Sequence, residues 1–171
     1  MHPRLLFILL VLSLAACRKA APPPTAPSPA PALKSLTLKI EVTALPAGFT
    51  PAAGEADPLR LTSVDAGVIT IARGPGTDLP AAVRGEEKRV AGLPGGRFVG
   101  SIELLCQLGR AYLTRARYQG KDGEETEEIR IFMVAAPGRP LVLSYTYPAA
   151  DSRRERLDQA LAVLQNIQSL P

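Results

Sequence analysis

Histidine and cysteine are scarce in this chain of 171 residues, and their scarcity excludes several kinds of catalytic site. The sequence contains one histidine, His2, and two cysteines, Cys17 and Cys106. His2 lies in an N-terminal segment that we expect to be removed on secretion. The rest of the chain then cannot form a Ser-His-Asp triad, a Cys-His pair, or a zinc or haem site with histidine ligands. We expect no cofactor and no enzyme of these classes.

The chain also lacks a concentrated positive charge. It has 20 basic and 16 acidic residues, and removal of residues 1–16 leaves 19 basic residues against 16 acidic ones. The small excess is scattered among acids, and only 5% of the residues are aromatic. Nucleic-acid binding uses a clustered basic face, so we expect no nucleic-acid partner.

The N-terminus has the pattern of a secretory signal. A short basic start, Met1 to Arg4, precedes an apolar run from Leu5 to Leu14 and two small residues, Ala15 and Ala16. A transmembrane helix needs about 20 apolar residues, roughly twice the length of this run. Residues 1–16 are therefore predicted to be a signal peptide, the alternatives being a plain transmembrane anchor or an ordinary signal with a coincidental cysteine.

The segment Leu14-Ala15-Ala16-Cys17 resembles the lipobox of bacterial lipoproteins. The resemblance implies a mature protein that starts at Cys17, with a diacylglyceryl group on the thiol and a further acyl chain such as palmitate on the amino terminus. Two or three acyl chains give stable membrane attachment. Arg18 stands where aspartate signals inner-membrane retention in the enteric system, so the resemblance favours the outer membrane, facing the periplasm.

A proline-rich tether follows the cysteine. Residues 20–32 contain six prolines and no charged or aromatic residue, so the segment cannot bury enough apolar surface to fold. As polyproline-like chain at ~3.1 Å per residue it would reach on the order of 40 Å. We assign residues 17–32 to the lipidated cysteine and its linker, and residues 33–171 to a single domain.

Alternating patterns predict strands in the first half of the domain. The predicted strands are 36–42, 59–62 and 68–72, the last two joined by a turn at Asp65-Ala66-Gly67. The stretch from Leu45 to Asp57 is predicted to be a loop. A short helix over residues 79–84 is predicted, with Asp78 or Thr77 as its cap, because Gly85 and the charged residues 86–89 weaken its continuation.

The second half has stronger signals. Strands are predicted over residues 102–108, 112–118, 127–135 and 141–147, with a hairpin turn at Lys121 to Glu124 because Asp122-Gly123 accepts positive φ. A helix follows, with a capping-box pair at Ser152 and Glu155. Its apolar stripe is Leu157, Ala160, Leu161, Leu164 and Ile167. The predicted fold class is α+β, an antiparallel β-sheet covered by helices.

Arg115 and Arg117 share one face of the predicted strand 112–118, and the returning strand brings Glu127, Glu128 and Arg130 opposite them. Cross-strand charge pairs are worth only ~0.2–1 kcal/mol each, so a solvated sheet face explains the pattern. The alternative is an anion or partner contact built on the two arginines. Cys106, in an apolar run, is expected to be an inert, buried or half-buried thiol, the alternative being a nucleophile or an intermolecular link.

The C-terminal half, from about Gly109 to Leu170, resembles the PsbP-like superfamily. The resemblance rests on Gly109-Arg110-Ala111 at the start of a strand, a hairpin, Tyr145-Thr146-Tyr147-Pro148 at the end of a strand, and a terminal helix ending near Ile167–Leu170. The Pro-rich loop from Leu45 to Thr50 also fits. The resemblance implies an α/β/α sandwich with structural or assembly roles and no catalytic residues.

Two functions remain open from the sequence. The first is a membrane-tethered envelope lipoprotein whose non-catalytic domain binds or assembles with an envelope protein or a cell-wall component. The second is an envelope hydrolase that uses two carboxylates held about 5–10 Å apart, as glycosidases do. Candidate carboxylates for the second are Glu41, Asp57, Glu103 and Asp122.

Overall fold

The computed structural model describes residues 32–52, 58–63, 67–151 and 154–171. The predictions for the signal peptide, Cys17 and most of the tether concern residues outside these ranges. None of the helices among the described residues is both long enough and apolar enough to cross a bilayer.

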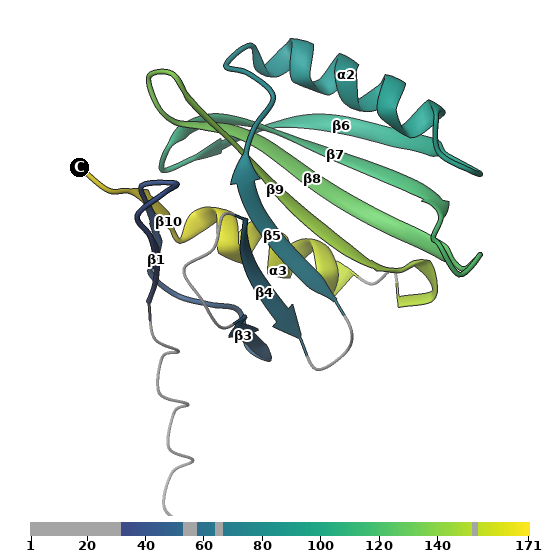
Figure 1. Ribbon diagram of the computed structural model, residues 1–171, viewed down its shortest axis with the longest axis horizontal. Helices are drawn as coiled ribbons and strands as arrows, with labels where there is room; N and C mark the ends of the chain where they lie inside the picture. The colour runs from purple at the N-terminus through teal and green to yellow at the C-terminus, as the bar shows by residue number, and fades with distance from the viewer. Residues whose placement is uncertain (1–31, 53–57, 64–66, 152–153) are drawn as a thin grey trace, which may run out of the picture.

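A seven-stranded antiparallel sheet forms the centre of the domain, with the order β3-β4-β5-β9-β8-β7-β6 (Figure 1). Its strands are β3 (Phe49–Pro51), β4 (Leu59–Ser63), β5 (Val68–Arg73), β6 (Arg97–Cys106), β7 (Gly109–Gln119), β8 (Glu125–Ala136) and β9 (Arg139–Pro148). The hairpin turn predicted at Asp122-Gly123 is confirmed, and Gly123 has a φ of 80°. The predicted antiparallel pairing of β4 and β5 is also confirmed, while Asp65 and Ala66 of the turn predicted between them lie outside the described residues. β3 lies within the predicted loop 45–57, which is therefore not entirely irregular.

Helix α2 (Leu79–Ala91) lies against one face of the sheet, over β6, β7 and β8. The predicted helix stops at residue 84, whereas α2 continues through Gly85 and the charged residues 86–89 and ends at Ala91, with Gly92 as its C-terminal cap. Tertiary contacts explain the difference, because Glu86 and Val90 are buried against the rest of the protein. The charged run therefore carries part of the buried face of the helix.

A separate three-stranded sheet joins the two ends of the domain. It contains β1 (Leu33–Ser35), β2 (Ile40–Val42) and β10 (Ile167–Ser169), with β2 in the middle. The predicted continuous strand 36–42 is wrong, because residues 36–39 form a turn in which Lys39 has a φ of 52°. The predicted helix end near residue 170 is also wrong. Helix α3 (Arg154–Gln165) ends before Ile167, which belongs to β10.

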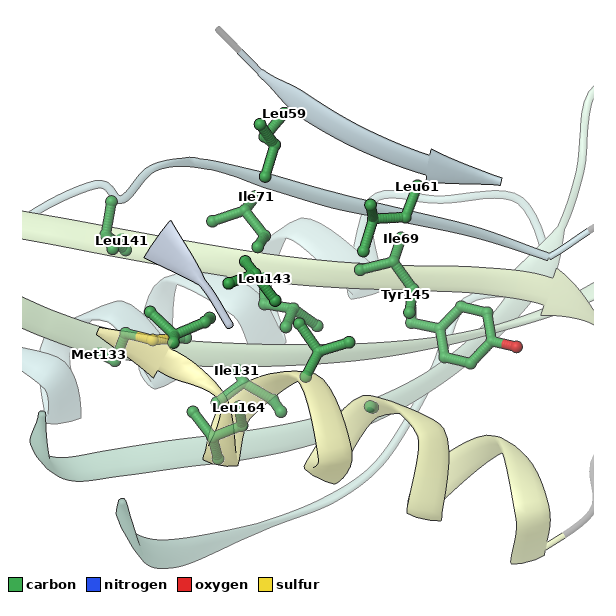
Figure 2. Close-up of a cluster of buried hydrophobic side chains, with 14 of the residues drawn as sticks. Leu59, Leu61, Ile69, Ile71, Ile131, Met133, Leu141, Leu143, Tyr145 and Leu164 are labelled. Atoms are coloured by element: carbon green, nitrogen blue, oxygen red, sulfur yellow. The ribbon is translucent and has the colours of Figure 1, made fainter. Parts of the chain in front are cut away.

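Helix α3 covers the other face of the sheet and follows the 3-10 turn η1 (Ala149–Asp151). Ser152 of the predicted capping box lies outside the described residues. The stripe is partly confirmed, since Ala160 and Leu164 are buried and Leu157 and Leu161 are half-buried against the core. Figure 2 shows part of this core. The labelled side chains are Leu59, Leu61, Ile69, Ile71, Ile131, Met133, Leu141, Leu143, Tyr145 and Leu164.

A smaller core lies on the α2 face. Leu79, Ala82 and Val83 of the helix pack against Phe132 of β8 and Val142 of β9. The domain therefore has helices on both faces of its main sheet (Figure 1). Cys106 is half-buried beside the larger core and is a free thiol.

The N-terminal cap of α2 is a first test of the fold. Asp78 is the cap, and its Oδ1 accepts a hydrogen bond from the backbone N–H of Ala81 at 3.0 Å. Asp78→Ala should lower the free energy of unfolding by about 1 kcal/mol, because that N–H then loses its partner within the protein. Thr77→Ala, at the exposed neighbouring position, should change it little, as measured by urea unfolding. Equal effects of the two changes would contradict the assignment of the cap.

Candidate functional site

Arg115 and Arg117 lie side by side on the α3 face of β7 and bind the same carboxylate. Nε of Arg115 donates to Oε1 of Glu127 at 3.1 Å, and Nε of Arg117 donates to Oε2 at 3.0 Å. Arg117 and Glu127 are direct cross-strand partners in the register of β7 and β8. Glu127 is completely buried, whereas the arginine side chains are 38% and 36% exposed. The carboxylate therefore holds two guanidinium groups that reach the surface.

Tyr147 completes this cluster from β9. Its hydroxyl donates to Oε1 of Glu127 at 3.0 Å. Burial of Tyr147, and secondly the charge of Glu127, raise the pKa of the tyrosine. The hydroxyl therefore stays protonated and acts as a fixed donor. The cluster is Arg115, Arg117, Glu127 and Tyr147, and we call it the β7 cluster.

The predicted pairing of the two strands was only partly correct. Glu127 faces the arginines, but Glu128 and Arg130 do not. Glu128 instead binds Arg89 of α2, on the opposite face of the sheet. Side chains alternate between the two faces of a strand, so neighbours in sequence serve different clusters. The role of Arg115 and Arg117 as an anion or partner contact stays a prediction.

A second cluster of charges lies between α2 and the sheet, and we call it the α2 cluster. Its members are Glu86 and Arg89 of α2 with Glu128 and Arg130 of β8. Nε of Arg89 donates to Oε2 of Glu86 at 2.9 Å, and Nη1 of Arg130 donates to the same oxygen at 2.5 Å. Arg130 is held further by Ser144 Oγ, which accepts from its Nε at 3.1 Å.

The electrostatics of the α2 cluster keep Glu86 and Arg89 charged. Burial alone would raise the pKa of Glu86, but the hydrogen bonds and charges of Arg89 and Arg130 outweigh burial and lower it. The hydrogen bond with Glu86 is the largest factor that raises the pKa of Arg89. Such a carboxylate does not carry a proton at neutral pH and cannot serve as a general acid.

The α2 cluster forms one wall of a cavity of about 750 Å³. The β5–α2 loop, the first two turns of α2, and Phe132 and Val142 of the main sheet form the rest of the wall. Its lining residues are Arg73, Gly74, Pro75, Gly76, Thr77, Asp78, Ala81, Ala82, Gly85, Glu86, Arg89, Arg130, Phe132 and Val142. A Cβ atom built at Gly76 or Gly85 would meet no other atom within 4 Å. The cavity, which we call the α2 groove, is therefore open along the helix.

The carboxylates do not converge in this groove. Asp78 and Glu86 both line it, but eight residues along a helix separate them by about 12 Å at 1.5 Å per residue. Asp78 is also committed to capping the helix. Of the carboxylates predicted for a hydrolase, Glu41 pairs with Lys34 in the small sheet and Glu103 accepts from the Tyr112 hydroxyl on the sheet edge.

Asp122 is not in the groove either. Asp122 lies in the β7–β8 turn, and Asp57 lies outside the described residues. Within the ranges that the structure describes, no cluster of three or more histidine, cysteine, aspartate or glutamate side chains is arranged to hold a metal ion.

Sequence reasoning missed the α2 cluster. A glutamate and an arginine three residues apart can pair on one helix face, and Glu86 and Arg89 carry this signal. As a local pattern, the charged residues 86–89 predict instead that the helix ends. The second half of the cluster comes from β8, which is 42 residues further along the chain, and no local pattern connects it to α2.

Comparisons with known proteins find solved structures of similar fold, but no match to the sequence. No protein-family model matches the chain, and no curated protein matches its sequence. LpqN of Mycobacterium tuberculosis, which is involved in cell envelope biogenesis, has a similar structure with a TM-score of 0.60 and 14% identity. The match covers 77% of this chain and 83% of LpqN.

Two further solved structures are similar. The Ran-binding protein Mog1p of Saccharomyces cerevisiae has a TM-score of 0.58 and 12% identity, with 81% of this chain and 94% of Mog1p covered. PsbP (CyanoP) from Synechocystis sp. PCC 6803 has a TM-score of 0.56 and 10% identity, with 88% and 98% covered. The chain therefore shares with these proteins a mixed fold of antiparallel sheets and few helices, in agreement with the predicted α+β class.

Proposed function

We propose that this protein is a lipid-anchored envelope protein whose non-catalytic domain binds an envelope protein or a cell-wall component in the α2 groove. The observation that carries the proposal is the α2 cluster. Each of its four charged side chains pairs with another within the cluster, and the groove beside it is open. At about 750 Å³ the groove has the volume of a binding site for a small molecule or a short segment of a partner.

The comparisons support an envelope role. LpqN, involved in cell envelope biogenesis, and the Ran-binding protein Mog1p share this fold, and the first of these suggests the same compartment for this chain. We further propose that the layers correspond to a PsbP-like α/β/α sandwich, with α2 and α3 as its outer layers. The likeness to CyanoP supports this arrangement.

Photo-crosslinking from two positions on α2 tests the binding site. A photoreactive residue at Ala81, which is exposed and lines the groove, should capture a specific envelope component in intact cells. The matched control is the same residue at Ala91, exposed on the last turn of α2 and outside the groove. In a pull-down with the component identified in this way, Ala81→Arg should abolish binding, whereas Ala91→Arg should preserve it. Equal capture from both positions would contradict a binding site in the groove.

The membrane anchor is a proposal of its own. Cys17 is proposed to carry lipid and to be the first residue of the mature protein. The lipid is proposed to hold the protein in the outer membrane, with the domain facing the periplasm. Mass spectrometry of the membrane-extracted protein should give a lipidated N-terminal peptide starting at Cys17, and Cys17→Ser should abolish it. A product that starts at Met1 would overturn the anchor, and fractionation wholly with inner-membrane markers would overturn the sorting.

The β7 cluster is a second candidate contact surface. Arg115 and Arg117 present two guanidinium groups at the surface, and an acidic partner would compete with Glu127 for them. If they contact a partner, Arg117→Gln should weaken its binding and Arg110→Gln, an exposed change on the same strand, should not. A carboxylate-dependent hydrolase is less well supported, because Asp78 and Glu86 in the groove are too far apart and are committed to other contacts.

A further inference from the structure

A second, smaller cavity lies where three segments meet at one end of the main sheet. It has a volume of about 240 Å³. One wall is the β8–β9 hairpin, where Gly138 has a φ of 75°. The others are the end of β5, which joins the hairpin through a hydrogen bond from Gly74 N–H to Pro140 O at 2.9 Å, and the turn after β1, with Thr37 and Leu38.

Arg139 in this cavity has a donor without an acceptor. Its Nη1 is buried and has no hydrogen-bond partner among the described residues. A guanidinium group is always charged and only donates, so nothing but an acceptor can satisfy it. Buried polar groups of proteins are nearly always hydrogen-bonded, and an exception calls for an explanation. Nη1 itself is covered by protein atoms, but the half-buried Arg139 side chain lines the cavity, so a small turn of that side chain would bring its guanidinium group to an acceptor held there.

The charges around this cavity define the ligand. Arg73 lines the cavity together with Arg139, and Lys39 lies exposed on the neighbouring turn. No aspartate or glutamate is among the described residues of the lining. Thr37 adds a hydroxyl group, and Leu38 and Leu141 supply apolar walls. The cavity therefore favours a negatively charged group with several acceptor oxygens.

We infer that this cavity, the Arg139 cavity, binds an oxyanion group, either a phosphate or a carboxylate, through the guanidinium of Arg139. Its volume is below the range of about 300–1,000 Å³ that drug-sized ligands occupy, so it fits the charged end of a ligand. The inference does not depend on the proposed function. The two cavities are neighbours, however, since Arg73 and Gly74 line both of them.

Calorimetric titration of the full-length protein in detergent tests the inference. Inorganic phosphate, acetate and glycerol 3-phosphate are titrated separately, with chloride holding the ionic strength constant. At least one should bind saturably, and Arg139→Gln should weaken that binding by about ten- to a hundredfold, the usual size of a lost charged hydrogen bond. The matched control is Arg84→Gln, which removes the same charge from an exposed position on α2 and should leave the binding unchanged.

The three anions separate the sources of the oxyanion. Tightest binding of acetate indicates a carboxylate ligand, tightest binding of inorganic phosphate a free phosphate, and tightest binding of glycerol 3-phosphate an esterified phosphate such as a lipid headgroup. Saturable binding that Arg139→Gln leaves unchanged would overturn the inference, as would the absence of saturable binding of all three anions.

Thermal unfolding provides a second measurement on the same variants. Without added oxyanion, Arg139→Gln should melt no lower than the unaltered protein, because Nη1 loses no hydrogen bond within the protein. The bound anion should raise the melting temperature of the unaltered protein and of Arg84→Gln, but not that of Arg139→Gln. A variant that melts much lower without anion would show that Arg139 has a structural role, and would overturn the inference.

Discussion

Glu127→Ala should lower the free energy of unfolding by about 3 kcal/mol. Glu127 is completely buried and accepts hydrogen bonds from Arg115, Arg117 and the hydroxyl of Tyr147. Removing one partner of a buried ion pair typically costs about 3–5 kcal/mol, because the remaining charge is left without compensation. We expect the low end of this range, since both arginines are more than one third exposed and water screens them in part.

Glu125→Ala is the matched control for this prediction. Glu125 lies on the same face of β8, two residues before Glu127, and is exposed. Its loss should change stability by less than about 0.5 kcal/mol, as surface changes usually do. Urea unfolding of both variants at neutral pH measures the difference. If Glu127→Ala were as mild as Glu125→Ala, the β7 cluster would be a solvated set of charges, as the cross-strand pairing energies first suggested.

The hairpins of the main sheet could be predicted because their signals are local. Asp122-Gly123 and the alternating residues on either side of it specify a turn and two strands within about 25 residues. The strands predicted over residues 112–118, 127–135 and 141–147 correspond to β7, β8 and β9, and their predicted bounds lie within three residues of the observed ones. The fold class followed from these elements, together with the apolar stripe of α3.

The small sheet could not be predicted, because its pairing is not local. β10 pairs with β2, whose residues lie more than 120 positions earlier in the chain. Alternation through residues 38–42 is real, since Leu38, Ile40 and Val42 are buried. The pattern does not reveal, however, that residues 36–39 form a turn and that the strand itself begins only at Ile40. Periodicity reports which face is buried and not where a strand breaks.

The candidate site shows the same division between local and distant signals. Arg115 and Arg117 could be placed on one face of a strand from their spacing alone. The groove could not be foreseen, because it forms where α2 crosses β8. Burial of Glu86 depends on that crossing, which supplies Arg130 as a second counter-charge. A charged run that weakens an isolated helix can therefore form the strongest ion pairs of that helix in the folded protein.

The second large effect is expected at Glu86, and it should depend on pH. Glu86 is 3% exposed, and its carboxylate binds both Arg89 and Arg130. Glu86→Gln should lower the free energy of unfolding at pH 7 by about 3 kcal/mol, because two arginines on the α2 face then lack their shared negative charge. The uncompensated charge of Arg130 should account for most of this loss of stability, since the Arg130 side chain is only 19% exposed.

The lowered pKa of Glu86 fixes the direction of the pH dependence. Its ordinary value is 4.5, and the arginines hold the folded-state pKa below that value. The unfolded chain therefore binds the proton more readily than the folded protein. The stability that Glu86 contributes is fully present above about pH 4.5 and is lost as the pH falls through the lower, folded-state pKa. The difference between Glu86→Gln and the unaltered protein should accordingly shrink below pH 4.5.

Glu87→Gln controls for the general effect of removing a carboxylate from α2. Glu87 is the next residue on the helix and is exposed, so its loss should leave both the stability at pH 7 and its slope with pH almost unchanged. Urea unfolding at several values between pH 7 and pH 3 distinguishes the two variants. A constant difference between Glu86→Gln and the unaltered protein across this range would mean that Glu86 packs without its charge mattering. The α2 groove would then lack the permanently ionised wall on which the proposed non-catalytic role depends.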